Sequence, residues 1–182
     1  MNLPDLSVWQ AGMEHDETAF NAVSYAINFL LDPPECRIDQ TTVATSVANS
    51  ITTCTAITFQ SASLDNDGMW NAATPTYLTI QTPGWYEVEF AMCWATKADT
   101  TLRMQGLTFN QDLALNSQIA LGYYINDGAT TPQIRQSYDM FLNTGDKLGL
   151  GALQNSGASL NSAPSASIKD QQIYLRVRWS AL

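Results

Sequence analysis

Residues 85–94, WYEVEFAMCW, show the clearest alternation of apolar and polar side chains in the chain. Successive side chains of a β-strand point to opposite faces, so this alternation predicts a strand with one buried and one wet face. Glu87 and Glu89 are expected on the wet face. The buried face is expected to carry Tyr86, Val88, Phe90, Met92 and Trp94.

The last segment, residues 172–179, repeats this alternation. Its inward residues are predicted to be Ile173, Leu175, Val177 and Trp179, and its outward residues Tyr174, Arg176 and Arg178. Further strands are predicted at residues 37–42, 50–59, 77–80, 102–109, 118–125, 133–142 and 147–153. No strand alternates with a helix, which excludes a parallel α/β fold. The pattern predicts a mainly β protein with an antiparallel jelly-roll sandwich.

Short clusters of Asn, Asp, Ser and Gly separate the predicted strands. Such residues favour tight turns, because they tolerate backbone angles that other residues avoid. Residues 157–167, rich in Ser, Ala, Asn and Pro, are predicted to form a long, exposed polar loop. The predicted turns are Asp65-Asn66-Asp67-Gly68, Asn126-Asp127-Gly128, Asn143-Thr144-Gly145-Asp146 and Asn155-Ser156-Gly157.

The N-terminal region has helical rather than alternating periodicity. Its apolar residues recur at i, i+3, i+7 and i+10, which predicts one apolar stripe on a helix over residues 17–31. Asp16 is the expected N-cap, and Pro33 and Pro34 end the helix. The stripe consists of Phe20, Val23, Ile27 and Leu30.

Two units are therefore expected: an N-terminal anchoring segment at residues 1–34 and a β-sandwich domain at residues 35–182. A short terminal helix with an apolar side must pack on something. It either covers its own sandwich or docks onto another protein, and Leu3 and Trp9 add apolar surface that favours docking. The predicted docking residues are Trp9, Phe20, Val23, Ile27 and Leu30.

Composition excludes several classes of partner. The chain has 182 residues, with 8 basic and 17 acidic side chains and a formal net charge of -9. This charge repels nucleic-acid phosphates and anionic lipid headgroups. No apolar run approaches the roughly 20 residues of a transmembrane helix, and residues 1–6 lack the layout of a signal peptide. The chain is expected to begin as a soluble intracellular product.

Candidate chemical sites are few. Cys36, Cys54 and Cys93 have no paired spacing, so buried free thiols are expected, with a Cys36–Cys54 disulfide as the alternative. His15, the only histidine, precedes the predicted helix and lies far in sequence from the β region. Gly149-x-Gly151 is expected to mark close strand packing.

Two pairs of acidic residues are also interpreted as structural rather than catalytic or metal-binding. Glu87 and Glu89 are expected on a solvated or interface face, paired with Arg176 or Arg178, rather than as a glycosidase pair. Asp65-x-Asp67-Gly68 resembles the start of a calcium loop, but Thr76 stands where that loop needs Glu, so a polar turn is expected. No enzyme activity, cofactor, metal ligand or catalytic residue is predicted.

Two stretches resemble the C1q and tumour-necrosis-factor-like jelly rolls. They are residues 78–86, LTIQTPGWY, and residues 142–148, LNTGDKL, and the resemblance extends over residues 37–182. Gly84 and Gly145 are expected to supply backbone angles that a Cβ would obstruct. The resemblance implies a non-enzymatic sandwich that assembles as a homotrimer.

The N-terminal segment resembles virion proteins of tailed bacteriophages, especially those that infect actinobacteria. The matching motifs are Trp9-Gln10-Ala11-Gly12, Asn21, and Leu30-Leu31-Asp32-Pro33-Pro34. Met13 separates Gly12 from Glu14, whereas the family has Glu directly after this Gly. The resemblance implies a minor capsid, head-decoration or minor tail protein of the virion, assembled in the host cytoplasm.

The sequence is thus interpreted as a virion structural protein, an oligomeric capsid decoration or head fibre attached through its N-terminal segment to a capsid or tail protein. A minor tail protein is the nearest alternative. A host-surface carbohydrate-binding module is another, with Trp70, Tyr123 or Tyr124 as its aromatic contacts. An enzyme that acts on surface polysaccharide is a third, but no catalytic constellation supports it.

Overall fold

The structure is a computed structural model that describes residues 17–97, 101–115, 118, 120–125, 133–164 and 172–180. The chain divides into two compact units between Pro34 and Glu35. The first unit is helical in its described part, and the second is built from strands.

The helix α1 spans Glu17–Leu31, the bounds that the apolar spacing predicts. Asp32, Pro33 and Pro34 separate it from the first strand. A proline has no backbone N–H and disfavours helical angles in the residue before it, so the helix ends here. The predicted N-cap, Asp16, lies outside the described residues.

The second unit contains strands of very different lengths, from two to ten residues. The strands are β1 Glu35–Gln40, β2 Ser46–Val47, β3 Thr55–Ala56, β4 Ser61–Asp65, β5 Tyr77–Thr79, β6 Gly84–Cys93, β7 Leu102–Phe109, β8 Ala120–Ile125, β9 Gln133–Leu142, β10 Lys147–Gln154, β11 Leu160–Asn161 and β12 Ile173–Trp179.

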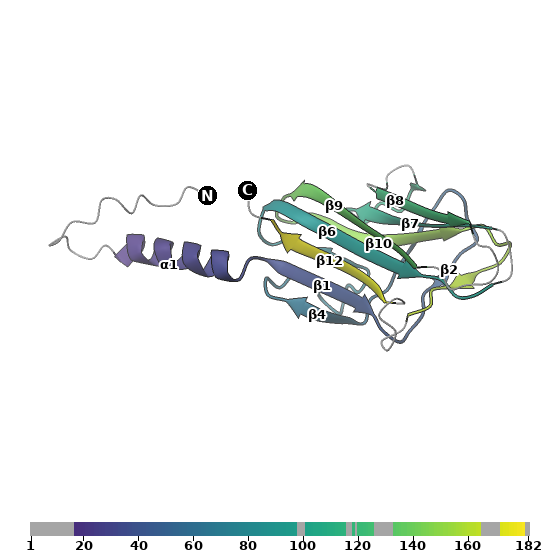
Figure 1. The fold of residues 1–182 in the computed structure, drawn as a ribbon, viewed down its shortest axis with the longest axis horizontal. Helices are drawn as coiled ribbons and strands as arrows, with labels where there is room; N and C mark the ends of the chain where they lie inside the picture. Colours follow the sequence, from purple (N-terminus) through teal and green to yellow (C-terminus); the bar gives the residue numbers. More distant parts are fainter. Residues whose placement is uncertain are drawn as a thin grey trace. The chain divides into compact units, whose positions relative to one another are not determined.

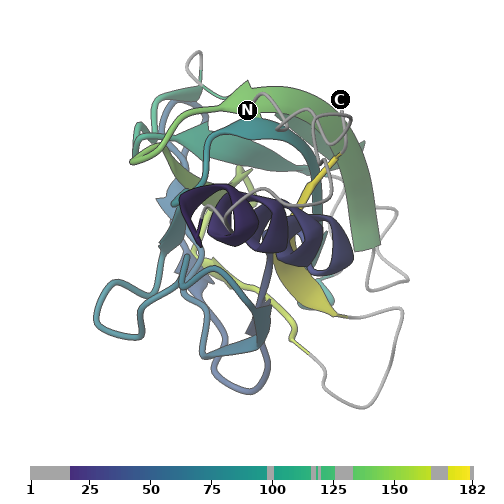
Figure 2. The same cartoon turned by 90° about the vertical axis from the view of Figure 1, so that its left-hand side faces the viewer.

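These strands form two main layers, seen side-on in Figure 1 and along the strands in Figure 2. One layer has the strand order β4-β1-β12-β6-β9. The other has the order β3-β10-β7-β8, with β5 also paired to β10, and a small β11-β2 sheet accompanies them. The strand pairs are antiparallel. The predicted mainly β, antiparallel sandwich with a short N-terminal helix is therefore confirmed.

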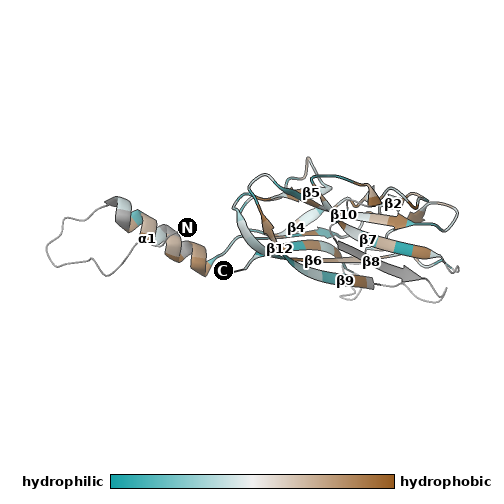
Figure 3. Cartoon of the chain, turned by 90° about the horizontal axis from the view of Figure 1, so that it is seen from above, coloured by the Kyte–Doolittle hydropathy of each residue, from teal (hydrophilic) through white to brown (hydrophobic). Residues whose placement is uncertain are grey.

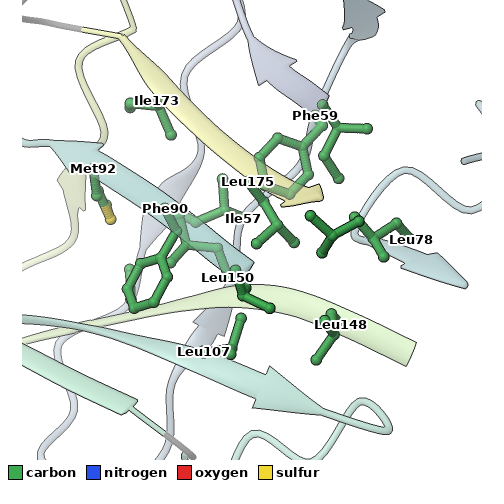
Figure 4. Close-up of a cluster of buried hydrophobic side chains, with 14 of the residues drawn as sticks. Ile57, Phe59, Leu78, Phe90, Met92, Leu107, Leu148, Leu150, Ile173 and Leu175 are labelled. Carbon is green, nitrogen blue, oxygen red and sulfur yellow. The ribbon is translucent and has the colours of Figure 1, made fainter. Parts of the chain in front are cut away.

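The apolar core lies between the two layers. Strands β6 and β12 contribute one wall, and β7 and β10 contribute the opposite wall (Figure 4). Burying an aliphatic or aromatic side chain of this size stabilises the fold by about 1.5–3 kcal/mol, which makes this wall-to-wall contact the main source of stability. Its fully buried members include Val88, Phe90, Met92, Leu107, Leu148, Leu150, Leu175 and Val177.

The alternation predicted for the two longest core strands is confirmed. Every inward residue predicted for β6 is completely buried, and Trp94, one residue beyond the strand, is buried as well. Trp94 pairs with Ser162 in an isolated bridge instead of continuing β6. In β12, Ile173, Leu175 and Val177 are completely buried, and Trp179 packs against the edge of the core.

The prediction of a strand at residues 50–59 is largely wrong, because only the two-residue strand β3 forms there. The segment lies beside β10, with which β3 pairs, and its other backbone amides donate to separate partners. The amide of Ser50 donates to Gln154, that of Cys54 to Leu113, and that of Ile57 to Leu150. Cys54, Ile57 and Phe59 are buried without a continuous ladder on either side, whereas Ile51 is exposed.

The prediction of a long loop at residues 157–167 is also only partly correct. It contains β11, which pairs with β2, and Leu160 is 7% exposed. Ser162 is buried too, and its hydroxyl donates to Gln40 Oε1 at 2.6 Å. Strand β4 was not predicted, since its sequence SASLD has only two apolar residues, Ala62 and Leu64, and neither is fully buried. Pairing with β1 holds it in the sheet.

Two predicted glycine roles are confirmed. Gly145 has φ of +91°, and the turn around it is closed by a bond from the Asn143 amide to Asp146 Oδ2 at 2.8 Å. Gly149 marks close packing, because a Cβ there would lie 2.7 Å from the Thr76 carbonyl oxygen.

Gly84 is required for a different reason from the predicted one. It begins β6 and does not have a positive φ. Instead, the Trp179 indole lies directly on it, and a Cβ at this position would be 2.2 Å from Trp179 Nε1. The glycine therefore provides space for an aromatic ring and not an unusual backbone angle.

Replacing Gly84 with Ala should destabilise the β unit by about 1–3 kcal/mol, the usual cost of overpacking. The midpoint of chemical denaturation measures this loss. In a Trp179→Leu background the same glycine substitution should cost much less, because the overlapping ring is gone. An equal cost in both backgrounds would contradict the assigned contact.

Candidate interaction surfaces

The predicted docking stripe lies on one side of α1. Phe20 is 60% exposed, Ile27 is 50% exposed and Leu30 is 61% exposed. Val23 is partly buried, and Trp9 lies outside the described residues. The hydrophobic colouring of α1 is strongest toward its C-terminal end (Figure 3). Taken by itself, the helical unit thus leaves large apolar side chains uncovered, and their docking role stays a prediction.

A second surface is the side of the β4-β1-β12-β6-β9 layer that faces away from the core, called here the outer sheet face. Its residues alternate along each strand with the buried residues of the core. They are Glu35, Arg37, Asp39, Trp85, Glu87, Glu89, Arg135, Ser137, Asp139, Phe141, Tyr174, Arg176 and Arg178.

Opposite charges on this face meet across neighbouring strands. Arg176 donates from Nε to Glu35 Oε1 at 2.6 Å, and its Nη1 lies 3.9 Å from Glu89 Oε2. Arg135 Nε also lies 3.8 Å from Glu89. The predicted pairing of the β6 carboxylates with Arg176 is confirmed for Glu89, which makes a catalytic role for this carboxylate unnecessary.

Tyr174 is outward-facing as predicted, yet it is only 2% exposed. The Arg37 guanidinium lies 4.1 Å from the centre of its ring, and the Arg135 guanidinium lies 5.7 Å from it. Its hydroxyl donates to Glu89. Burial and the neighbouring Glu89 carboxylate raise the pKa of Tyr174. The middle of the outer sheet face is therefore a compact, covered cluster.

An exposed aromatic pair stands at one end of the same face. Trp85 and Phe141 occupy paired positions on β6 and β9, 44% and 51% exposed. Their rings meet edge to face with centroids 5.9 Å apart. The next pair along, Glu87 and Asp139, is exposed and acidic. The sequence prediction missed this pair, although large aromatic residues at outward strand positions were a usable signal.

A polar groove of about 410 Å³ opens at the other end, over β4, β1 and β12. The serines of β4 are short, which leaves space beside the longer side chains of β1. Arg37 Nη2 donates to Gln172 Oε1 at 2.9 Å, and Ser63 donates to Asp39 Oδ2 at 2.5 Å. Its lining includes Arg37, Asp39, Thr41, Ser61, Ser63 and Gln172.

The aromatic residues predicted to contact carbohydrate do not form a described surface. Trp70 packs against the core and bridges Leu78. Tyr123 and Tyr124 lie in β8, and their side chains are outside the described part of the structure. The described side chains therefore do not test whether these rings share a surface.

The other candidate sites have structural explanations. Asp65 accepts from the amides of Met69 at 2.7 Å and Trp70 at 3.0 Å, which confirms the predicted polar turn. His15 lies outside the described residues. Across the described ranges, no group of three or more His, Cys, Asp or Glu side chains could hold a metal ion.

The three cysteines are buried free thiols, as predicted. Burial raises the pKa of Cys54 to about 11. The pKa of Cys36 is also raised, mainly by burial and to a lesser extent by the nearby Asp65 carboxylate. A thiol is a weak nucleophile until it ionises, so the raised pKa values of Cys36 and Cys54 disfavour their reaction at neutral pH.

No helix in the described part of the chain is long and apolar enough to cross a membrane.

No family model and no curated protein matches the sequence. Solved structures do match the fold. The globular domain of zebrafish complement 1qA protein is 12% identical, with a TM-score of 0.51 over 82% of this chain and 98% of that chain. Murine APRIL is 12% identical, with a TM-score of 0.54 over 80% and 98%. Eiger TNF from S. frugiperda is 11% identical, with a TM-score of 0.51 over 81% and 94%.

These similarities are too distant in sequence to transfer a function, and they concern the fold alone. They agree with the antiparallel pairing, the two layers and the single interlayer core. The β unit therefore has a C1q/TNF-like jelly-roll fold.

Proposed function

We propose that this chain is a non-enzymatic attachment protein, in which the β unit forms a homotrimer and residues 1–34 anchor it to a larger particle. The observation that carries the proposal is the exposed apolar stripe of α1. Phe20, Ile27 and Leu30 are each at least half exposed. A helix with such a stripe gains stability only when another surface covers it.

The particle we propose is the capsid of a tailed bacteriophage, with the chain as a head fibre or decoration protein. The N-terminal resemblance supports this choice, because Trp9-Gln10-Ala11-Gly12 and Leu30-Leu31-Asp32-Pro33-Pro34 bracket the helix. Attachment to the tail, as a minor tail protein, is the alternative. In either case the protein acts by binding, with free energy from the burial of apolar side chains, and no chemical step is involved.

The outer sheet face supports trimerisation of the β unit. Jelly rolls of the resembled superfamily assemble as trimers, and this face carries features of an interface. Trp85 and Phe141 offer exposed aromatic surface at one end. Acidic Glu87 and Asp139 lie next to them, and exposed Arg178 lies one strand away. A surface with separate acidic and basic strips can pair with copies of itself.

Binding of a host-surface glycan is the second candidate, and the polar groove favours it. Arg37 and Asp39 form an ion pair at 2.9 Å, so the groove is close to neutral. Both side chains are held in place by neighbours, with Ser61 and Ser63 beside them. Preorganised groups that donate and accept hydrogen bonds suit a neutral saccharide. Glycan binding that survives trimer disruption but is lost in Ser63→Phe would favour this candidate.

Deleting residues 1–34 should leave a folded trimer that no longer binds phage particles. The β unit has its own core, so circular dichroism and light scattering should give a β spectrum and a threefold mass. Co-sedimentation with particles that lack the native protein measures attachment. The full chain is the positive control. A deletion variant that still sediments with particles would exclude the N-terminal anchor.

Replacing Phe141 with Ser should break the trimer without unfolding the monomer. The ring is 51% exposed, so its removal costs the monomer little, whereas an interface aromatic contributes about 2 kcal/mol or more. Light scattering at several concentrations measures the change. Ile51→Ser is the matched control, because Ile51 is 62% exposed but lies outside this face. A monomeric native protein, or equal masses for both variants, would contradict this interface.

A further inference from the structure

The apolar stripe of α1 has the spacing of a coiled-coil seam. Phe20, Val23, Ile27 and Leu30 are separated by three, four and three residues. This is the alternation of a and d positions over two heptads, and such residues pack knobs-into-holes against equivalent helices. The spacing alone allows several kinds of partner helix, but a second copy of α1 has the required pattern by definition.

The lack of charged residues in α1 after its first residue, Glu17, makes this self-association favourable. From Thr18 to Leu31 the sequence has no Asp, Glu, Lys, Arg or His, although the whole chain has a net charge of -9. Parallel copies of one helix bring identical residues to the same height, so any charge beside the seam would face itself. Ala19 and Ala26 stand directly before Phe20 and Ile27, where small residues permit close approach.

The helix is too short to associate by itself. Its 15 residues are near the lower limit for a stable isolated helix in water, and two heptads give a small interface. Only Asp32, Pro33 and Pro34 separate it from β1, a span of at most about 10 Å. Trimerisation of the β unit would therefore raise the local concentration of the three helices greatly.

We propose that the partner of the apolar stripe is the same stripe on the other two copies, so that the α1 segments form a parallel three-helix bundle. This inference rests on the trimer of the proposed function and names the surface that covers its helix. The β unit sets the number of copies, because the mixed seam residues do not select one oligomeric state by themselves.

The bundle changes how the anchor binds its particle. With Phe20, Ile27 and Leu30 facing one another, these residues no longer contact the particle, and the proposed anchor binds it through apolar residues away from the seam. Leu31 is 78% exposed, and Trp9 precedes the helix. Three copies of this surface would project from one bundle, and a trivalent anchor gains avidity without stronger individual contacts.

Disulfide trapping in the full-length chain tests the bundle. Ile27→Cys places a thiol in the seam, and Asn21→Cys places one at an exposed heptad position outside the seam. Under glutathione disulfide, two protein thiols each lose a proton and an electron to form one disulfide, and the oxidant becomes two glutathione molecules. We expect the Ile27→Cys variant to form covalent dimers several-fold faster than Asn21→Cys. The native thiols are buried and contribute little background.

The solution mass of the unmodified chain separates the possible outcomes. A trimer in which both cysteine variants cross-link at the same rate overturns the bundle and leaves the proposed trimer intact. A monomer overturns the trimer and the bundle together. Mixing Phe20→Cys with Leu30→Cys tests direction, since rapid cross-linking between the two variants would mean antiparallel helices and overturn the parallel bundle.

Discussion

The contact between the inward faces of β6 and β12 and those of β7 and β10 is the constraint on which the rest of the structure depends. Successive side chains of a strand alternate between faces, so burying Phe90 and Leu175 against Leu107 and Leu150 also decides what points outward. A shift of one residue in β6 would expose its core residues and bury its two glutamates. The outer sheet face is therefore a consequence of the core.

That outer face has two different parts. Around Tyr174, arginine and carboxylate side chains are joined by stacking and ion pairs, so a polar layer covers the Tyr174 ring. At the β6–β9 end, Trp85 and Phe141 are left half exposed. Long arginine side chains can lie over a ring while their charged ends reach carboxylates, which explains the covered part. The aromatic end has no such cover, and an interface would supply it.

In the proposed attachment protein the two units would have different roles, oligomerisation for the β unit and anchoring for the helical unit. The β unit has a core of its own and, in the proposed trimer, would hold the copies together through its sheet. The helix lacks enough surface to be stable alone, and its apolar stripe is useful only against a partner. Joined by three residues, the two units would couple oligomerisation to anchoring, since each added copy would bring another helix and another docking segment.

The sequence by itself determined the elements whose signals are local. The spacing of apolar residues defined α1 and its stripe, alternation defined the two faces of β6, and the Gly145 turn followed from its own residues. Tertiary structure decided the rest. The burial of Tyr174, the meeting of Trp85 with Phe141, and the polar groove depend on which strands become neighbours and in which register. Residues far apart in sequence make those contacts, and no local period encodes them.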